Sequence, residues 1–123
     1  MNTLISDSQK ANEIFVTLTY FNQEIIKQLE NLKLDGKDIT LVCKKPMKEN
    51  GLVNEKAQNY IEQLNHLIIK CILVQTTPQP FVVIDEGLIW YGDLHFYTIN
   101  DANKTSIRIV NSELANKLLQ QYI

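Results

Sequence analysis

The sequence predicts an α/β fold in which a mixed, mostly parallel sheet is flanked by helices and ends in a C-terminal β-hairpin. Across residues 13–75, apolar strand-like runs alternate with segments of helical periodicity, which is typical of a parallel sheet. Further on, two short apolar runs flank the turn signal Asp85-Glu86-Gly87, which indicates a hairpin. A length of 123 residues suits one domain, and we expect residues 1–123 to form it.

The first half of the chain begins with a strand that is apolar on both faces. Residues 13–21 read EIFVTLTYF, so side chains on either side of this strand are apolar or β-branched and both faces should be covered. Asn22 can cap a following helix, and Gly36 can end it. Residues 38–43, DITLVC, then predict a second short buried strand.

A loop and a second helix lead to the third strand. Residues 44–53 contain Pro46 and Gly51 and predict a loop. Asn54 can cap a helix whose predicted buried stripe is Ala57, Ile61, Leu64 and either Leu67 or Ile68. Residues 70–75, KCILVQ, predict the third strand.

The C-terminal part changes from alternation to antiparallel pairing. Residues 81–84 and 88–91 form the predicted hairpin, and residues 105–110 predict one more strand. Ser112 can cap a last helix, whose predicted buried stripe is Leu114, Ala115, Leu118, Leu119 and Tyr122. The first strand begins close to the start of the sequence, so the chain is compatible with being a piece of a longer protein.

Composition excludes several functional classes. The hydrophobic share of 45% and the charged share of 21% are ordinary for a globular protein. The net charge is −2 and Arg108 is the sole arginine, which disfavours nucleic acid as a partner. The sequence has no apolar run of membrane-spanning length and no signal-peptide pattern, so we expect a cytoplasmic protein without membrane contact.

The cysteines and histidines do not predict a metal or redox site. Cys43 and Cys71 each lie in an apolar strand-like run, which indicates buried, protonated thiols. His66 and His95 are the only histidines, too few for a protein metal cage. We therefore expect neither a metal nor another cofactor, and a Cys–His catalytic pair is disfavoured.

Residues 77–100 carry the most informative pattern, TPQPFVVIDEGLIWYGDLHFYTIN. The apolar run FVVID ends in Asp85, and six residues separate Asp85 from Gly92. This spacing resembles the signature half of the phospholipase D-like superfamily, in which His-x-Lys, four residues and Asp are followed six residues later by Gly-Ser-x-Asn. The segments ITLVCKKP, KCILV and TSIRIVNSELANKLL look like the single-domain, helicase- or restriction-associated branch of that family.

The family's functional side chains are largely missing from the matching positions. Pro78 stands at the histidine position, Pro80 at the lysine, Asp93 at the serine and His95 at the asparagine. Proline offers neither the nucleophile nor the cation that the family's phosphoryl transfer needs, and Asp93 would repel a phosphodiester. The resemblance therefore implies a phospholipase D-like domain without catalytic activity.

Local backbone chemistry supports a structural role for this segment. The Pro-x-Pro entry fixes two φ angles and removes two donors, so the strand should start late or lie at an edge. Asp85 and Glu86 favour a turn rather than acid–base work. We expect the former site to be closed or converted into a contact surface.

Three functional hypotheses remain open. The first is a binding or assembly module in a DNA-processing or defence context. Because the family builds one site from two halves, it would form a homodimer, or bind a protein such as a helicase or nuclease subunit. Nucleic acid is a further possible partner, which the acidic net charge disfavours. Trp90 and Tyr91 are candidate interface anchors, although a core position is favoured for Trp90.

The second hypothesis is a phosphodiesterase or nuclease in which His95 acts as nucleophile or acid. Phosphate would then be held by Lys44, Lys45 or Arg108. The third is an α/β protein that shares only the fold. The basic loop of Lys44, Lys45 and Lys48 is interpreted as a solvated surface.

Overall fold

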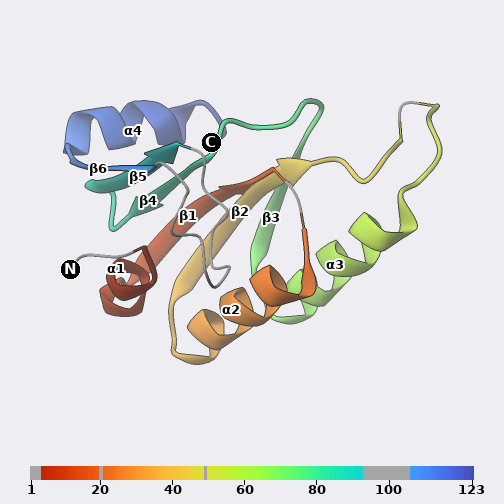
Figure 1. Cartoon of the computed structure of the whole chain (residues 1–123), viewed down its shortest axis with the longest axis horizontal. Helices are drawn as coiled ribbons and strands as arrows, with labels where there is room; N and C mark the ends of the chain where they lie inside the picture. The colour runs from red at the N-terminus through yellow and green to blue at the C-terminus, as the bar shows by residue number, and fades with distance from the viewer. Residues whose placement is uncertain (1–3, 20, 49, 93–105) are drawn as a thin grey trace.

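The computed structural model describes residues 4–19, 21–48, 50–92 and 106–123, which build a six-stranded sheet between two layers of helices (Figure 1). The strands are β1 (Glu13–Leu18), β2 (Asp38–Lys44), β3 (Lys70–Val74), β4 (Phe81–Ile84), β5 (Leu88–Gly92) and β6 (Ser106–Val110). The helices are α1 (Leu4–Lys10), α2 (Gln23–Leu34), α3 (Glu55–His66) and α4 (Ser112–Gln120).

The sheet has the order β3-β2-β1-β4-β5-β6 and divides at β1. β1, β2 and β3 are parallel and are joined through α2 and α3, whereas β4, β5 and β6 continue from β1 by antiparallel pairing. The predicted α/β class, mixed sheet and hairpin are confirmed. Antiparallel pairing extends further than the sequence indicated, because β4 pairs directly with β1 and β6 extends the hairpin.

Two cores lie on opposite faces of the sheet. On one face α1, α2 and α3 pack against alternate strand residues, including Ile14, Val16, Leu18, Ile39 and Leu41. On the other face α4 packs against Phe15, Phe81, Val83 and Ile89 (Figure 1). β1 is buried from Ile14 to Leu18, which confirms the prediction that both of its faces are covered.

The helix caps agree with the sequence at two of three positions. The side-chain oxygens of Asn22 and Asn54 accept hydrogen bonds from Ile25 N (2.8 Å) and Ala57 N (3.2 Å). The predicted cap Ser112 is wrong by one residue. Asn111 has the extended backbone of a cap and accepts from Leu114 N at 3.0 Å, whereas Ser112 is already helical.

The structure decides between two alternative core positions and corrects a third. Of Leu67 and Ile68, Leu67 packs against the core. Ile68 follows the end of α3 with φ of 62°, and this left-handed turn leaves its side chain 81% exposed. Leu114, in the first turn of α4, is 37% exposed because Ala115, Leu118 and Leu119 form the buried stripe. α1 was not predicted at all, since its sequence LISDSQK has no clear apolar periodicity.

Candidate functional site

Two of the motif positions, Pro80 and Gly92, are joined by a hydrogen bond at the start of β4. Pro78 is buried, Pro80 is half-buried, and β4 starts at the next residue, Phe81. The N–H of Gly92, which ends β5, donates to the carbonyl of Pro80 at 3.2 Å. The sequence predicted that this strand would start late or lie at an edge, and the late start is confirmed. β4 is not an edge strand, because it lies between β1 and β5.

A buried hydroxyl holds the Pro-x-Pro segment against β1. Thr17 Oγ1 accepts from Phe81 N at 2.9 Å and donates to the carbonyl of Gln79. Tyr91 donates its hydroxyl to Gln79 Oε1 at 2.8 Å. Polar groups around the two prolines are thus engaged in contacts that fix the sheet.

Asp85 lies at the opposite end of β4 from Pro80. Its φ is 51° and that of Glu86 is 60°, positive values that suit the tight turn between β4 and β5. Asp85 Oδ1 accepts from the backbone N–H groups of Asn12 (3.0 Å) and Glu13 (2.9 Å). The carboxylate therefore fixes the start of β1, and the predicted turn role of Asp85 and Glu86 is confirmed.

The remaining motif positions, Asp93 and His95, lie outside the described residues, so the hypothesis that His95 acts as a nucleophile or acid stays a prediction. The other histidine, His66, is exposed on the last turn of α3. Within the described ranges no three His, Cys, Asp or Glu side chains are arranged to hold a metal ion.

The thiols are unsuited to nucleophilic chemistry. Cys43 is buried at the end of β2, and burial raises its pKa to about 12. Burial also raises the pKa of Cys71, on β3, to about 11. Both thiols are protonated at neutral pH, and a protonated thiol is a poor nucleophile and a poor metal ligand.

Trp90 belongs to the core and is held by a carboxylate from α1. Asp7 Oδ2 accepts from Trp90 Nε1 and from Arg108 Nε, each at 2.8 Å. The Arg108 guanidinium lowers the pKa of Asp7 against the opposing effect of burial. Arg108 therefore anchors α1 to β6, and the favoured prediction that Trp90 is a core residue is confirmed over the alternative of an interface anchor. Tyr91 is half-buried and stacks on Phe81.

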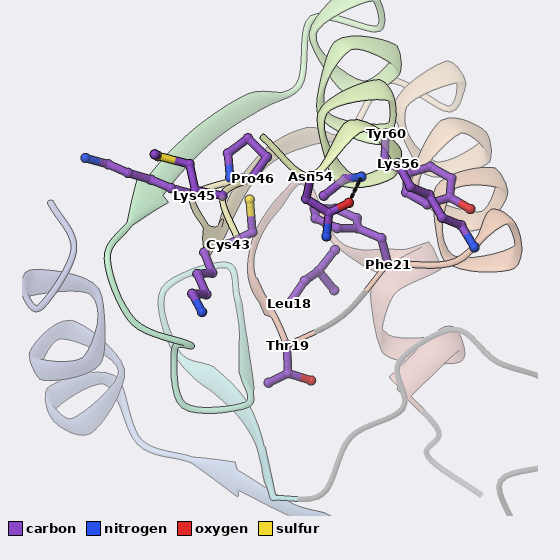
Figure 2. A pocket seen from close by; sticks show the side chains of 12 residues that line it. Leu18, Thr19, Phe21, Cys43, Lys45, Pro46, Asn54, Lys56 and Tyr60 are labelled. Carbon is purple, nitrogen blue, oxygen red and sulfur yellow. Dashed lines mark hydrogen bonds between the residues drawn. The ribbon is translucent and has the colours of Figure 1, made fainter. Parts of the chain in front are cut away.

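A pocket of about 310 Å³ opens where β1 and β2 end, beside the start of α3. Figure 2 shows Lys45 and Pro46 on one side of it and Lys56 and Tyr60 on the other. Crevices at the carboxyl ends of parallel strands are the usual ligand sites of α/β sheets. The lining residues are Leu18, Thr19, Phe21, Cys43, Lys44, Lys45, Pro46, Met47, Asn54, Lys56, Ala57 and Tyr60.

The lysines give this end of the sheet a local positive charge. A second hollow of about 280 Å³ shares Lys44, Lys45 and Met47 with the pocket and adds Lys48. No carboxylate appears among the described residues that line either hollow. The loop that the sequence suggested was merely solvated therefore borders two concave surfaces.

Sequence reasoning missed the pocket and the Asp7 anchor for different reasons. The pocket had a readable signal, because Lys44, Lys45 and Pro46 directly follow a buried strand and Asn54 caps the next helix. The Asp7 anchor had no signal in the sequence, because Asp7, Trp90 and Arg108 are far apart along the chain. They come together only because the folded sheet places α1 beside β5 and β6.

None of the described helices is long and apolar enough to span a membrane. No protein-family model and no curated protein matches the chain. Among solved structures, TrmBL2, an archaeal chromatin protein whose structure shows a novel mode of DNA binding, matches 96% of this chain with a TM-score of 0.60 and 12% identity. A polyphosphate kinase from Porphyromonas gingivalis matches 97% with a TM-score of 0.62 and 15% identity.

The chain covers only part of each of these proteins, 45% of TrmBL2 and 21% of the polyphosphate kinase. At such low identity the likeness concerns the fold alone. The described α/β architecture therefore recurs as one portion of larger proteins, of which one binds DNA and another is a kinase.

Proposed function

We propose that the chain is a phospholipase D-like domain that binds and assembles without cleaving phosphodiesters. The observation that carries this proposal is the state of the motif segment. Pro78 is buried, the carbonyls of Gln79 and Pro80 accept hydrogen bonds within the sheet, and Asp85 is engaged at the far end of β4. Groups in these roles are not free to attack or neutralise a phosphorus centre.

The neighbouring structures support a binding role of this kind. One is part of a protein described as binding DNA, and the other is part of an enzyme named for polyphosphate. Both names involve polyanions, and the lysines at the carboxyl ends of β1 and β2 would suit such a partner in this chain as well.

The assembly part of the proposal follows from the family resemblance. A signature half that works with a second half implies a two-fold homodimer, or pairing with a larger partner such as a helicase or nuclease subunit. β6 is the outer strand of the described sheet, and its Ile107 and Val110 are 57% and 75% exposed. An unpaired strand edge of this type is suited to pairing with another chain.

Hydrolysis of a chromogenic phosphodiester tests the loss of catalysis. We expect the folded protein to release no more chromophore than buffer does, because Pro78 and Pro80 stand where the family has its nucleophilic histidine and its lysine. Turnover that disappears in His95→Ala would support the competing phosphodiesterase hypothesis and overturn the proposal.

A further inference from the structure

We propose that the pocket at the carboxyl ends of β1 and β2 binds a nucleotide, with the phosphate at the lysines and the planar base against the apolar wall. This assignment rests on the proposed function in one respect, that the ligand is bound and not cleaved. The shared chemistry is a phosphate ester joined to a ring. Its source is either a free nucleotide or the end of a nucleic-acid strand.

The charge of the pocket selects an anion. Lys44, Lys45 and Lys56 line it, and Lys48 extends the positive charge into the adjoining hollow. The whole chain has a net charge of −2, so this local concentration of cations departs from the average surface. Lysine ammonium groups bind phosphate as point charges and can reorient on their flexible stems.

The volume and the apolar wall of the pocket favour a ligand that carries a planar ring as well as a phosphate. Its volume of about 310 Å³ is that of a small-ligand site. Phe21 and Tyr60 line it as a stacked pair with ring centroids 5.8 Å apart. Leu18, Pro46 and Met47 add apolar surface. A planar ring would cover this wall, whereas inorganic phosphate would leave it exposed to water.

The residues present favour binding of an unchanged ligand. The described lining contains no histidine, and its cysteine, Cys43, has a pKa raised to about 12. A thiol that stays protonated needs a neighbouring base before it can attack a phosphate ester, and the described lining holds neither a histidine nor a carboxylate to serve as that base.

The test is a titration of the intact protein with two fluorescent probes, labelled adenosine 5′-monophosphate and a labelled 5′-phosphorylated single-stranded oligonucleotide. Lys45→Glu/Lys56→Glu should weaken binding by on the order of tenfold or more, because two attractive charges become repulsive. The matched control is Lys27→Glu/Lys70→Glu. It makes the same charge change at exposed lysines outside the pocket, with Lys70 at the opposite end of the sheet, and should bind within about twofold of wild type.

Each arm has a defined meaning. Binding of the monophosphate indicates that the ligand is a free nucleotide. Binding of the oligonucleotide alone indicates that the ligand is the end of a strand. Either result supports the proposal if the pocket variant Lys45→Glu/Lys56→Glu binds that probe more weakly than wild type. The proposal is overturned if neither probe binds at millimolar concentration, if the pocket variant binds like wild type, or if unphosphorylated adenosine competes as well as the monophosphate.

Failure here is distinguishable from failure of the proposed function. If wild type binds no nucleotide and hydrolyses no phosphodiester, the ligand assignment is wrong and the non-catalytic role stands. If wild type hydrolyses a phosphodiester and also binds the nucleotide at the pocket, the non-catalytic role is wrong and the ligand assignment stands. The fluorescence of Trp90, followed through denaturant unfolding, verifies that each variant is folded.

Discussion

Three residues other than glycine have a left-handed backbone within the described ranges: Ile68, Asp85 and Glu86. Aspartate tolerates this conformation, but a β-branched side chain is strained in it. Ile68 follows α3, where Ile69 N donates to Leu64 O at 3.1 Å across the turn. Because Ile68 is 81% exposed, packing offsets little of its strain.

We predict that Ile68→Gly raises the free energy of unfolding by about 1 kcal/mol, since glycine adopts positive φ without a Cβ clash. Denaturant unfolding followed by Trp90 fluorescence measures the change. Ile68→Ala is the matched control, because it removes the exposed side chain but keeps a Cβ. An equal gain from alanine would show that backbone strain is not the cause.

Asp7 makes stability depend on pH at the acid end. Its pKa is lowered by the hydrogen bonds from Arg108 and Trp90, so its contribution is complete above the ordinary aspartate pKa of about 3.9. The contribution is lost as pH falls through the lowered, folded-state value. We predict that Asp7→Asn costs about 2 kcal/mol near pH 7 and progressively less below pH ~4, as measured by urea unfolding across pH.

Glu13 provides a control of opposite sign. Glu13 is exposed at the start of β1, and partial desolvation there, together with the nearby carboxylates of Glu86, Asp38 and Asp85, raises its pKa, so the folded state favours its protonated form. Glu13→Gln should therefore be more stable than wild type at neutral pH, and the gain should vanish below its ordinary pKa of about 4.3.

A pH profile for Asp7→Asn that runs parallel to that of wild type would refute the role assigned to the Asp7 ion pair.

At the scale of elements, β4 depends on Thr17 because prolines precede it. The hydroxyl satisfies the N–H of Phe81 and the carbonyl of Gln79 at the point where the sheet begins again after the Pro-x-Pro segment. We predict that Thr17→Val, which is similar in shape but lacks the hydroxyl, lowers the free energy of unfolding by about 2 kcal/mol, measured by thermal or chemical unfolding.

Thr19→Val is the matched control, since Thr19 is exposed just beyond the end of β1. Its effect should stay within about 0.5 kcal/mol, as for most surface substitutions. If both variants unfold at the same denaturant concentration, the buried hydroxyl does not hold the segment.

The sequence predicted most elements because their local signals agree with the fold. The apolar runs of β1 and β2, the Asn22 and Asn54 caps and the Asp85-Glu86 turn all act over a few residues. α1 escaped prediction because long-range contacts of Asp7 hold it. The structural role of Pro78 and Pro80 could be predicted from the sequence. The pocket could not, because it forms only where β1, β2 and α3 come together in three dimensions.

For the whole molecule we predict a homodimer, detected by light scattering as a mass of two chains that falls to one on dilution. Val110→Lys should shift the equilibrium toward monomer, because it places a charge on the exposed outer strand β6. Leu34→Lys is the control, an equally exposed apolar residue at the end of α2. A mass of one chain at every concentration would contradict the dimer.

The most direct test of the central claim is incubation of end-labelled single-stranded DNA with the folded wild-type protein and with His95→Ala, with the products resolved by length. We propose that the residues of the motif segment hold the sheet together and do not carry out phosphoryl transfer. We predict that the strand remains intact with both proteins at every protein concentration. Shortened strands produced by wild type and absent with His95→Ala would contradict the account.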